Sequence, residues 1–348
     1  MIDTGHEERG MGQHAVTVVA DPASAEALAP LLDHWRYGPG LRLLPWGAVA
    51  GGGSRAVAAL ADGAGAVLVV GPRERSPRTV LPAPVLTARD GRVVPAAWLP
   101  ATSAQDLARF ARTAVAVHAR AARAATDPDA GRSAPAERRT PAPPGAPCTL
   151  TVLGERHPRF DRLVDRIVRI GGEADDGCQV QRATAYELSR DDLVDLLATG
   201  PALGLYVGHG RPVGWVGYAG IRARHLADAV SLEGHRPAGA LVSLTCHTAS
   251  RRRTGLSFAE SLPLRGVAAA TLGAVTSSLH TGNARWALRI ARGLGAARTI
   301  GDLVVMIAPH DPHAATYRLL GDPTAPLLDA PAAELAQHPH PHPLEEAS

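Results

Sequence analysis

Short apolar runs that end in glycine or polar residues recur along the chain and predict buried parallel strands. The clearest are Leu203–Val207, followed by Gly208-His209-Gly210, and 240–245, followed by Cys246-His247. Continuous apolar runs of this kind are typical of strands covered by helices on both faces of a sheet. In such sheets ligands bind beyond the carboxyl ends of the strands, so we expect His209 and Cys246 to face one crevice.

The first part of the chain alternates between strand and helix patterns. Apolar runs at 15–19, 41–44 and 66–70 predict strands, and helices are expected from Asp21 or Ser24 to about Trp35, at 54–62 and at 103–125. Segments 84–87 and 92–99 flank Asp90-Gly91, a dipeptide that favours a hairpin turn. Strands that alternate with helices indicate a mainly parallel sheet. We therefore expect a small α/β domain at 15–125, acting as a companion or recognition unit.

A segment rich in proline, alanine and arginine at 126–147 has no apolar periodicity and is typical of a linker. Beyond it, strands are predicted at 149–153, 180–183, 267–272 and 317–320, and helices at 158–170, 190–198, 283–294 and 300–307. These predict a second, larger domain at 148–328, an α/β fold with a mostly parallel sheet and helices on both faces. Residues 1–14 and 329–348 are expected to be disordered.

The composition of the chain argues against several classes of function. All 36 basic residues are arginines, the net charge is only +3 and aromatics make up 4%, which disfavours a nucleic-acid partner. The three cysteines, Cys148, Cys178 and Cys246, are an odd number without metal-type spacing, so neither a disulfide scaffold nor a metal site is expected. With a polar amino terminus and no apolar run near ~18 residues, we expect a cytoplasmic protein without a membrane partner.

Four motifs in a fixed order carry a family resemblance. They are LYVGHG at 205–210, LTCHTA at 244–249, GLSFAE at 255–260 and LLGDPT at 319–324, and the cysteine follows the histidine at a separation of 37 positions. Together the motifs resemble the caspase-like cysteine peptidases, and are most similar to gingipain-type peptidases and CHAT-type domains. The resemblance covers about 149–328 and implies a caspase-like sheet.

The resemblance implies that Cys246 is the nucleophile and His209 its base, and that the backbone N–H groups of Gly210 and Cys246 form the oxyanion hole. The chemistry of the pair agrees, because a thiolate is the attacking species and a nearby histidine both activates the thiol and protonates the leaving amine. We therefore predict a cysteine endopeptidase without a cofactor. Its expected partners are a protein or peptide substrate and, by the CHAT resemblance, other members of an intracellular multi-protein system.

The same residues could also have structural rather than catalytic roles. Cys246 could be a buried structural cysteine and His209 a hydrogen-bonded loop residue, and His247 competes with His209 as the base. Two other functions compete with peptide hydrolysis: an inactive caspase-like scaffold that binds partners, and a nucleotide-binding protein. The second lacks a phosphate loop apart from Gly-Gly-Gly-Ser at 51–54.

The substrate-binding residues are predicted from their position after strands. Ser277, Ser278 and His280 follow the strand at 267–272 and are expected to line the same crevice, with Ser277 and His280 contacting substrate. Trp215 is expected to wall a pocket or to pack in the core. Glu155 and Asp161 are conceivable as the family's substrate-pocket acid. The arginines at 251–253 are expected in a solvated loop, cleavage of which could accompany activation.

Overall fold

The structure, a computed structural model, describes residues 15–50, 53–126, 149–173 and 179–327. The segments predicted to be disordered, 1–14 and 329–348, and the predicted linker apart from Thr126 lie outside the described residues. Cys148 and Cys178 lie outside them too, so Cys246 is the free cysteine that the structure places.

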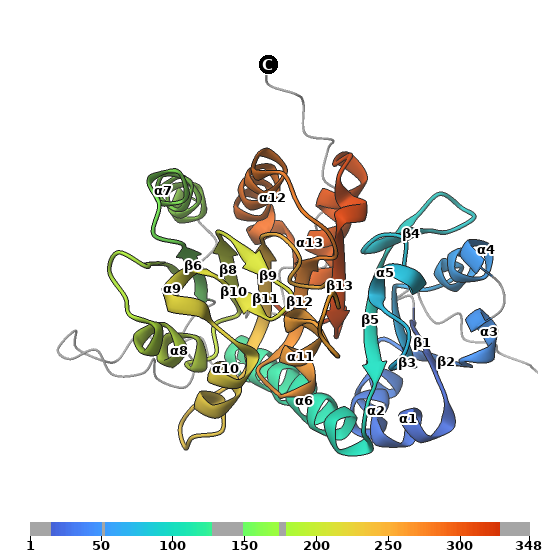
Figure 1. Cartoon of the computed structure of the whole chain (residues 1–348). Coiled ribbons are helices and arrows are strands. Elements are labelled where there is room, and N and C mark those ends of the chain that lie inside the picture. The colour runs from blue at the N-terminus through green and yellow to red at the C-terminus, as the bar shows by residue number, and fades with distance from the viewer. Residues whose placement is uncertain (1–14, 51–52, 127–148, 174–178, 328–348) are drawn as a thin grey trace, which may run out of the picture.

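One eleven-stranded sheet runs through the described residues in the order β2-β1-β3-β5-β13-β12-β11-β8-β6-β7, with β4 beside β5 (Figure 1). Its strands are parallel except for β13 against β12 and β4 against β5, which confirms the predicted fold class. The strands are β1 Val16–Ala20, β2 Leu41–Pro45, β3 Ala66–Pro72, β4 Val85–Thr87, β5 Val93–Ala101, β6 Thr149–Gly154, β7 Gln179–Thr184, β8 Leu203–Val207, β11 Ala238–Leu244, β12 Ala268–Ala274 and β13 Tyr317–Gly321. A separate small hairpin pairs β9 Gly210–Arg211 with β10 Gly214–Trp215.

Helices cover both faces of the sheet because successive side chains of a strand point to opposite sides. Leu205 of β8 belongs to the buried cluster that includes side chains of α7 and α12, whereas the next residue, Tyr206, belongs to a cluster with α8, α10 and α11. The helices are α1 Pro22–Ala27, α2 Ala29–Tyr37, α3 Gly47–Ala50, α4 Gly53–Ala58, α5 Pro77–Val80, α6 Ala104–Thr126, α7 Pro158–Glu173, α8 Arg190–Ala198, α9 Gly217–Gly220, α10 Ala223–Val230, α11 Phe258–Leu264, α12 His280–Gly293 and α13 Ile300–Ile307.

The two halves of the chain share this sheet. β5 of the first half pairs in parallel with β13, the last strand of the second half, at Leu319↔Ala97 and Leu320↔Trp98. The helix α6 lies against α1 and α2 and also against α11 and β12, so it spans both halves (Figure 1). The sequence predicts two domains; the structure adds that they are joined edge to edge, and their independence stays a prediction.

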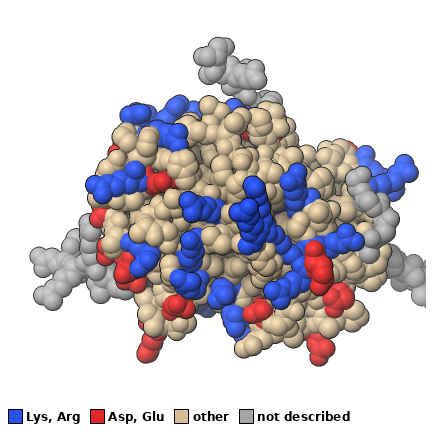
Figure 2. Space-filling model, in the orientation of Figure 1, with Lys and Arg blue, Asp and Glu red and all other residues tan. Residues whose placement is uncertain are grey.

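Arginine side chains are prominent on one face of the molecule. Figure 2 shows arginine side chains spread across the middle of the face in view, with many of the acidic side chains toward its lower edge. Among the described residues, no helix combines the length and the hydrophobicity needed to span a bilayer.

Candidate active site

The register of two neighbouring strands brings Cys246 and His209 to the same edge of the sheet. β8 and β11 pair in parallel, and the last pair of the ladder is Leu244↔Val207. His209 and Cys246 each lie two residues beyond that pair. Neighbouring strands are ~4.8 Å apart, so the two side chains leave adjacent strand ends at equal height. Among the described residues, no group of three or more His, Cys, Asp or Glu is arranged to bind a metal ion.

Gly210 allows the histidine loop to lie directly against the cysteine loop. A Cβ atom on Gly210 would lie 1.7 Å from Oγ1 of Thr245 and 2.6 Å from the carbonyl oxygen of Cys246. Real Cβ atoms do not approach that closely, so only glycine fits here. This close packing places the backbone of Gly210 next to Cys246, as an oxyanion hole shared by the two residues requires.

His209 is exposed, and its contacts come from β8, from the segment that follows β6 and from Val216, whose backbone N–H donates to the His209 carbonyl oxygen at 2.9 Å. Its backbone N–H donates to the Glu155 carboxylate, and its carbonyl oxygen accepts from the Tyr206 hydroxyl at 3.2 Å. Its ring lies edge-on to Phe160 at 5.6 Å between centroids, and Nε2 is 3.1 Å from Nη2 of Arg159. The main chain of His209 is therefore fixed on both sides, while its ring contacts an arginine.

Cys246 is partly exposed and its sulfur contacts Ser278. The backbone N–H of Ser278 donates to Sγ at 3.4 Å, and the carbonyl and hydroxyl oxygens of Ser278 lie 3.6 and 3.7 Å from the same atom. The pKa of the Tyr317 hydroxyl is raised mainly by burial and further by Asp311 and Cys246. The segment after β12 thus supplies the immediate surroundings of the thiol.

His247, the competing base, has other contacts. Its φ of 63° is left-handed, which costs a residue other than glycine about 1–2 kcal/mol and turns the chain sharply after Cys246. Its Nε2 lies 3.0 Å from Oγ of Ser277, and its buried Nδ1 has no hydrogen-bond partner in the structure. Ser277, predicted to bind substrate, therefore contacts His247.

The other two predicted substrate residues differ in exposure. Trp215 is 1% exposed, donates from Nε1 to Oγ of Ser243 at 2.8 Å and stacks on Tyr206 at 4.6 Å, as expected of the core alternative. His280 is exposed, opens α12 and lies edge-on to Phe160 at 5.6 Å. Two imidazoles, His209 and His280, therefore contact one phenyl ring.

The sequence analysis missed Arg159 and Phe160, and named Glu155 only as a conceivable pocket acid. All three follow β6, the strand next to β8, so their nearness to His209 follows from strand order. One signal for their place was present, because polar residues directly after a buried strand mark the ligand-binding edge, but nothing in the sequence indicated the order of the strands. Asp161, the other conceivable acid, is paired with Arg182 at 2.5 Å.

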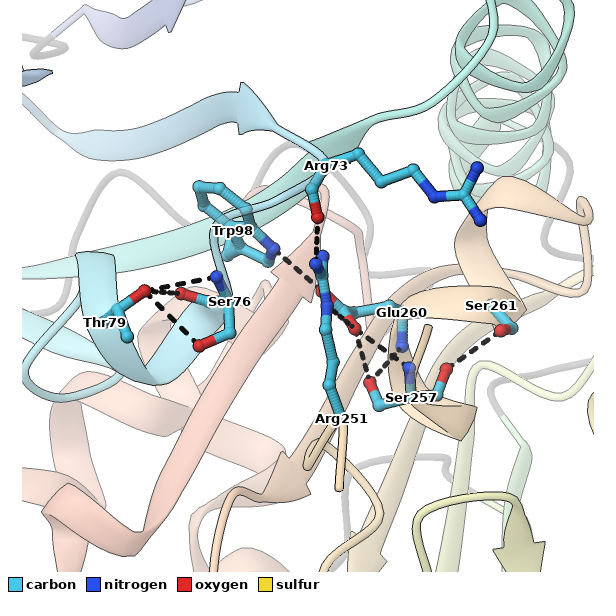
Figure 3. Close-up of polar contacts among 8 residues, drawn as sticks. All are labelled: Arg73, Ser76, Thr79, Trp98, Arg251, Ser257, Glu260 and Ser261. Atoms are coloured by element: carbon cyan, nitrogen blue, oxygen red, sulfur yellow. Dashed lines mark hydrogen bonds and ion pairs between the residues drawn. The ribbon is translucent and has the colours of Figure 1, made fainter. Parts of the chain in front are cut away.

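The loop after Cys246 is held by a buried ion pair, which corrects the prediction that its arginines are all solvated. Arg251 donates from Nε to both carboxylate oxygens of Glu260, at 2.9 and 2.8 Å, and its side chain is only 13% exposed (Figure 3). Glu260 is fully buried, and a buried carboxylate needs a partner of opposite charge. Arg252 and Arg253 are exposed as expected, and the hypothesis of cleavage in this loop now concerns these two.

The Arg251–Glu260 ion pair also contacts residues of the first half of the chain. Nε1 of Trp98 in β5 donates to Glu260 at 3.0 Å, and Arg251 also donates to the carbonyl oxygen of Arg73 (Figure 3). Ser257 donates to Glu260 from its backbone and its hydroxyl, both at 2.9 Å. The loop that follows the candidate nucleophile is thereby anchored to both halves.

Comparison with known proteins agrees with this arrangement. Residues 168–328 match the model of Peptidase family C25. This match spans both His209 and Cys246. The matched family agrees with the resemblance to gingipain-type cysteine peptidases that the motifs carry. No curated protein matches the chain in sequence.

Solved structures show the same fold at low sequence identity. A structure described as a protease has a TM-score of 0.64 at 14% identity and covers 92% of this chain and 80% of its own. The Arg-specific cysteine proteinase gingipain R (RgpB) has a TM-score of 0.61 at 14% identity, with 92% and 80% covered. The complex of Porphyromonas gingivalis RgpB pro- and mature domains gives 0.61 at 14%, with 90% and 80% covered.

Proposed function

We propose that the protein hydrolyses peptide bonds with Cys246 as nucleophile and His209 as general acid and base. The observation that carries the proposal is the placement of both residues two positions beyond the last pair of adjacent parallel strands, with Gly210 packed against Cys246. Glu155 and Tyr206, which fix the His209 main chain, support it.

The mechanism follows from these positions. The Cys246 thiolate attacks the substrate carbonyl, and the backbone N–H groups of Gly210 and Cys246 stabilise the oxyanion. The protonated His209 then gives its proton to the leaving amine. A water molecule, deprotonated by His209, attacks the acyl-enzyme and restores the thiol.

The test is hydrolysis of a fluorogenic peptide library by wild type, Cys246→Ala, His209→Ala and the double variant. Each single variant should abolish hydrolysis, and the double variant should be little worse because the two residues act as a unit. Ser231→Ala, at an exposed serine that ends α10, is the matched control and should keep wild-type activity. Full activity in Cys246→Ala would end the proposal.

A second candidate, an inactive partner-binding scaffold, is favoured by one observation. The contacts that the structure gives for the Cys246 sulfur are to Ser278, and those for His209 Nε2 are to Arg159. Catalytic contacts are often loose in unliganded enzymes, so the arrangement also fits a resting peptidase. Labelling with a peptidyl electrophile distinguishes the scaffold from the peptidase. A scaffold leaves Cys246 unlabelled in native protein, whereas a peptidase is labelled at Cys246 alone.

We also propose a cytoplasmic setting within a multi-protein system, with residues 15–125 as a companion unit. Support comes from the odd number of cysteines without disulfide or metal spacing, from the CHAT resemblance and from the pairing of β5 with β13. Cell fractionation, followed by affinity purification of the Cys246→Ala variant, tests both the location and the partners.

A further inference from the structure

An arginine with unused hydrogen-bonding capacity lies beside His209. Arg159 stands in the first turn of α7, with its guanidinium carbon 4.5 Å from the ring centre of Phe160 and Nη2 3.1 Å from Nε2 of His209. Its Nε is buried and has no hydrogen-bond partner among the residues that the structure describes. A buried N–H without an acceptor is costly, so Arg159 has an unsatisfied donor that points to a missing acceptor.

The surroundings of Arg159 are basic. Ring contacts place His157, His209, His280 and Arg159 around Phe160. In keeping with this, the pKa of His280 is lowered, first by its partial desolvation and then by Arg159, His157 and His209. The nearby acids are occupied, since Glu155 accepts from the His209 backbone and Asp161 is paired with Arg182. Within the described part of the chain, no salt bridge places a carboxylate on Arg159.

We propose that Arg159 binds an acidic side chain of the substrate, Asp or Glu, at a residue flanking the scissile bond. This rests on the proposed function, because it deepens the role of that same site. The planar guanidinium matches a carboxylate with two parallel hydrogen bonds, and Nε together with one Nη atom is the fork that such a pair uses. The preference is opposite in charge to that of the Arg-specific proteinase whose fold this chain shares.

The contact with His209 adds a consequence for the rate. An arginine can only donate, so Nε2 of His209 accepts from Arg159 at 3.1 Å and its lone pair is occupied. A substrate carboxylate draws the guanidinium away and frees Nε2. His209 then takes the proton from Sγ of Cys246, and an acidic substrate raises kcat as well as lowering KM.

The test compares peptides that are identical except at the two residues flanking the scissile bond, where Asp, Glu, Asn, Gln or Arg is placed. In wild type, acidic peptides should exceed their amide isosteres about 10- to 100-fold in kcat/KM, as expected for hydrogen bonds to a charged group. Arg159→Gln should remove this ratio, and Arg159→Glu should reverse it in favour of Arg peptides.

Arg156→Gln is the matched control. Arg156 lies in the loop just before α7 and is exposed, with its guanidinium over the ring of Tyr186 at 5.3 Å, so its loss removes one positive charge without touching His209. The acidic preference should survive in this variant. Urea unfolding of each variant checks that the fold is kept.

The outcomes separate the two proposals. A wild-type preference for arginine or for amide peptides overturns the role of Arg159 and leaves peptide hydrolysis standing. If no peptide is cleaved, hydrolysis fails, and calorimetric binding of Asp and Asn peptides to Cys246→Ala decides the specificity alone. Equal binding there, or an acidic preference that persists in Arg159→Gln, overturns the inference.

Discussion

At the scale of single residues, the site depends on how closely two backbones approach. Gly210→Ala places a methyl group where Thr245 and the Cys246 carbonyl already lie, so the histidine loop has to move away from the cysteine loop. A displacement of 1 Å is enough to cost about 100-fold in rate. We expect a loss of at least that size in kcat/KM toward the best peptide, with a smaller effect on stability.

Gly172→Ala is the control for this substitution. Gly172 lies in α7, where an added Cβ meets nothing within 4 Å, so activity should stay at the wild-type level. Wild-type kcat/KM in Gly210→Ala would show that the two loops do not need this contact.

The sequence could name the residues at the strand ends but not those that surround them. His209, Gly210 and Cys246 stand at abrupt breaks after apolar runs, and such breaks are visible in one dimension. Arg159 opens an amphipathic helix, where a charged residue is typical of a solvated surface, so its contact with His209 is a property of strand order. Trp215 was ambiguous for the same reason, because burial depends on neighbours distant in sequence.

At the scale of elements, the loop after Cys246 and the helix α11 form one unit around Glu260. Glu260 caps α11 through Ser257 and pairs with Arg251, so one carboxylate fixes both the helix start and the loop. Glu260→Gln removes the charge and replaces one carboxylate oxygen with an amide NH2 group. That group can only donate, and it faces N–H and O–H groups that already donate to Glu260. Because breaking a buried pair leaves the other charge uncompensated, the free energy of unfolding should fall by about 3–5 kcal/mol.

Urea unfolding measures this loss, and the alkylation rate of Cys246 shows whether the loop moves. Arg252→Gln changes an exposed arginine of the same loop and should stay within about 0.5 kcal/mol of wild type. Similar stabilities of Glu260→Gln and Arg252→Gln would mean that the ion pair contributes nothing.

Local signals predicted most elements of the fold. The helix at 190–198 begins at its Ser189 cap, where the hydroxyl accepts from the backbone N–H of Asp192, and the hairpin around Asp90-Gly91 is present as β4 and β5. The helix α11 was missed although Ser257 and Glu260 form a capping box, because Pro263 interrupts its pattern. The short pair β9 and β10 has too few residues to show any period.

At the scale of the whole molecule, the joining of the two halves could not be predicted from the sequence. Pairing of β5 with β13 depends on strands more than 200 residues apart, and no local pattern records which strands become neighbours. The buried polar contacts at the junction are equally non-local. His118 lies 2.8 Å from Asp322, and Trp35 donates to Thr324 at 2.9 Å.

Limited proteolysis tests this junction directly. The composition of 126–147 predicts cleavage there before either half is touched, since exposed chain without stable structure is the preferred substrate. The two fragments should nevertheless elute together in size-exclusion chromatography, because the shared sheet, α6 and the Glu260 network still join them. Urea should separate them, and at a lower concentration in Glu260→Gln than in wild type, because that variant loses the charge that holds Arg251, which also donates to the Arg73 carbonyl oxygen of the first half. Fragments that part without denaturant would show two independent domains, and an uncut 126–147 segment would show that no linker lies there.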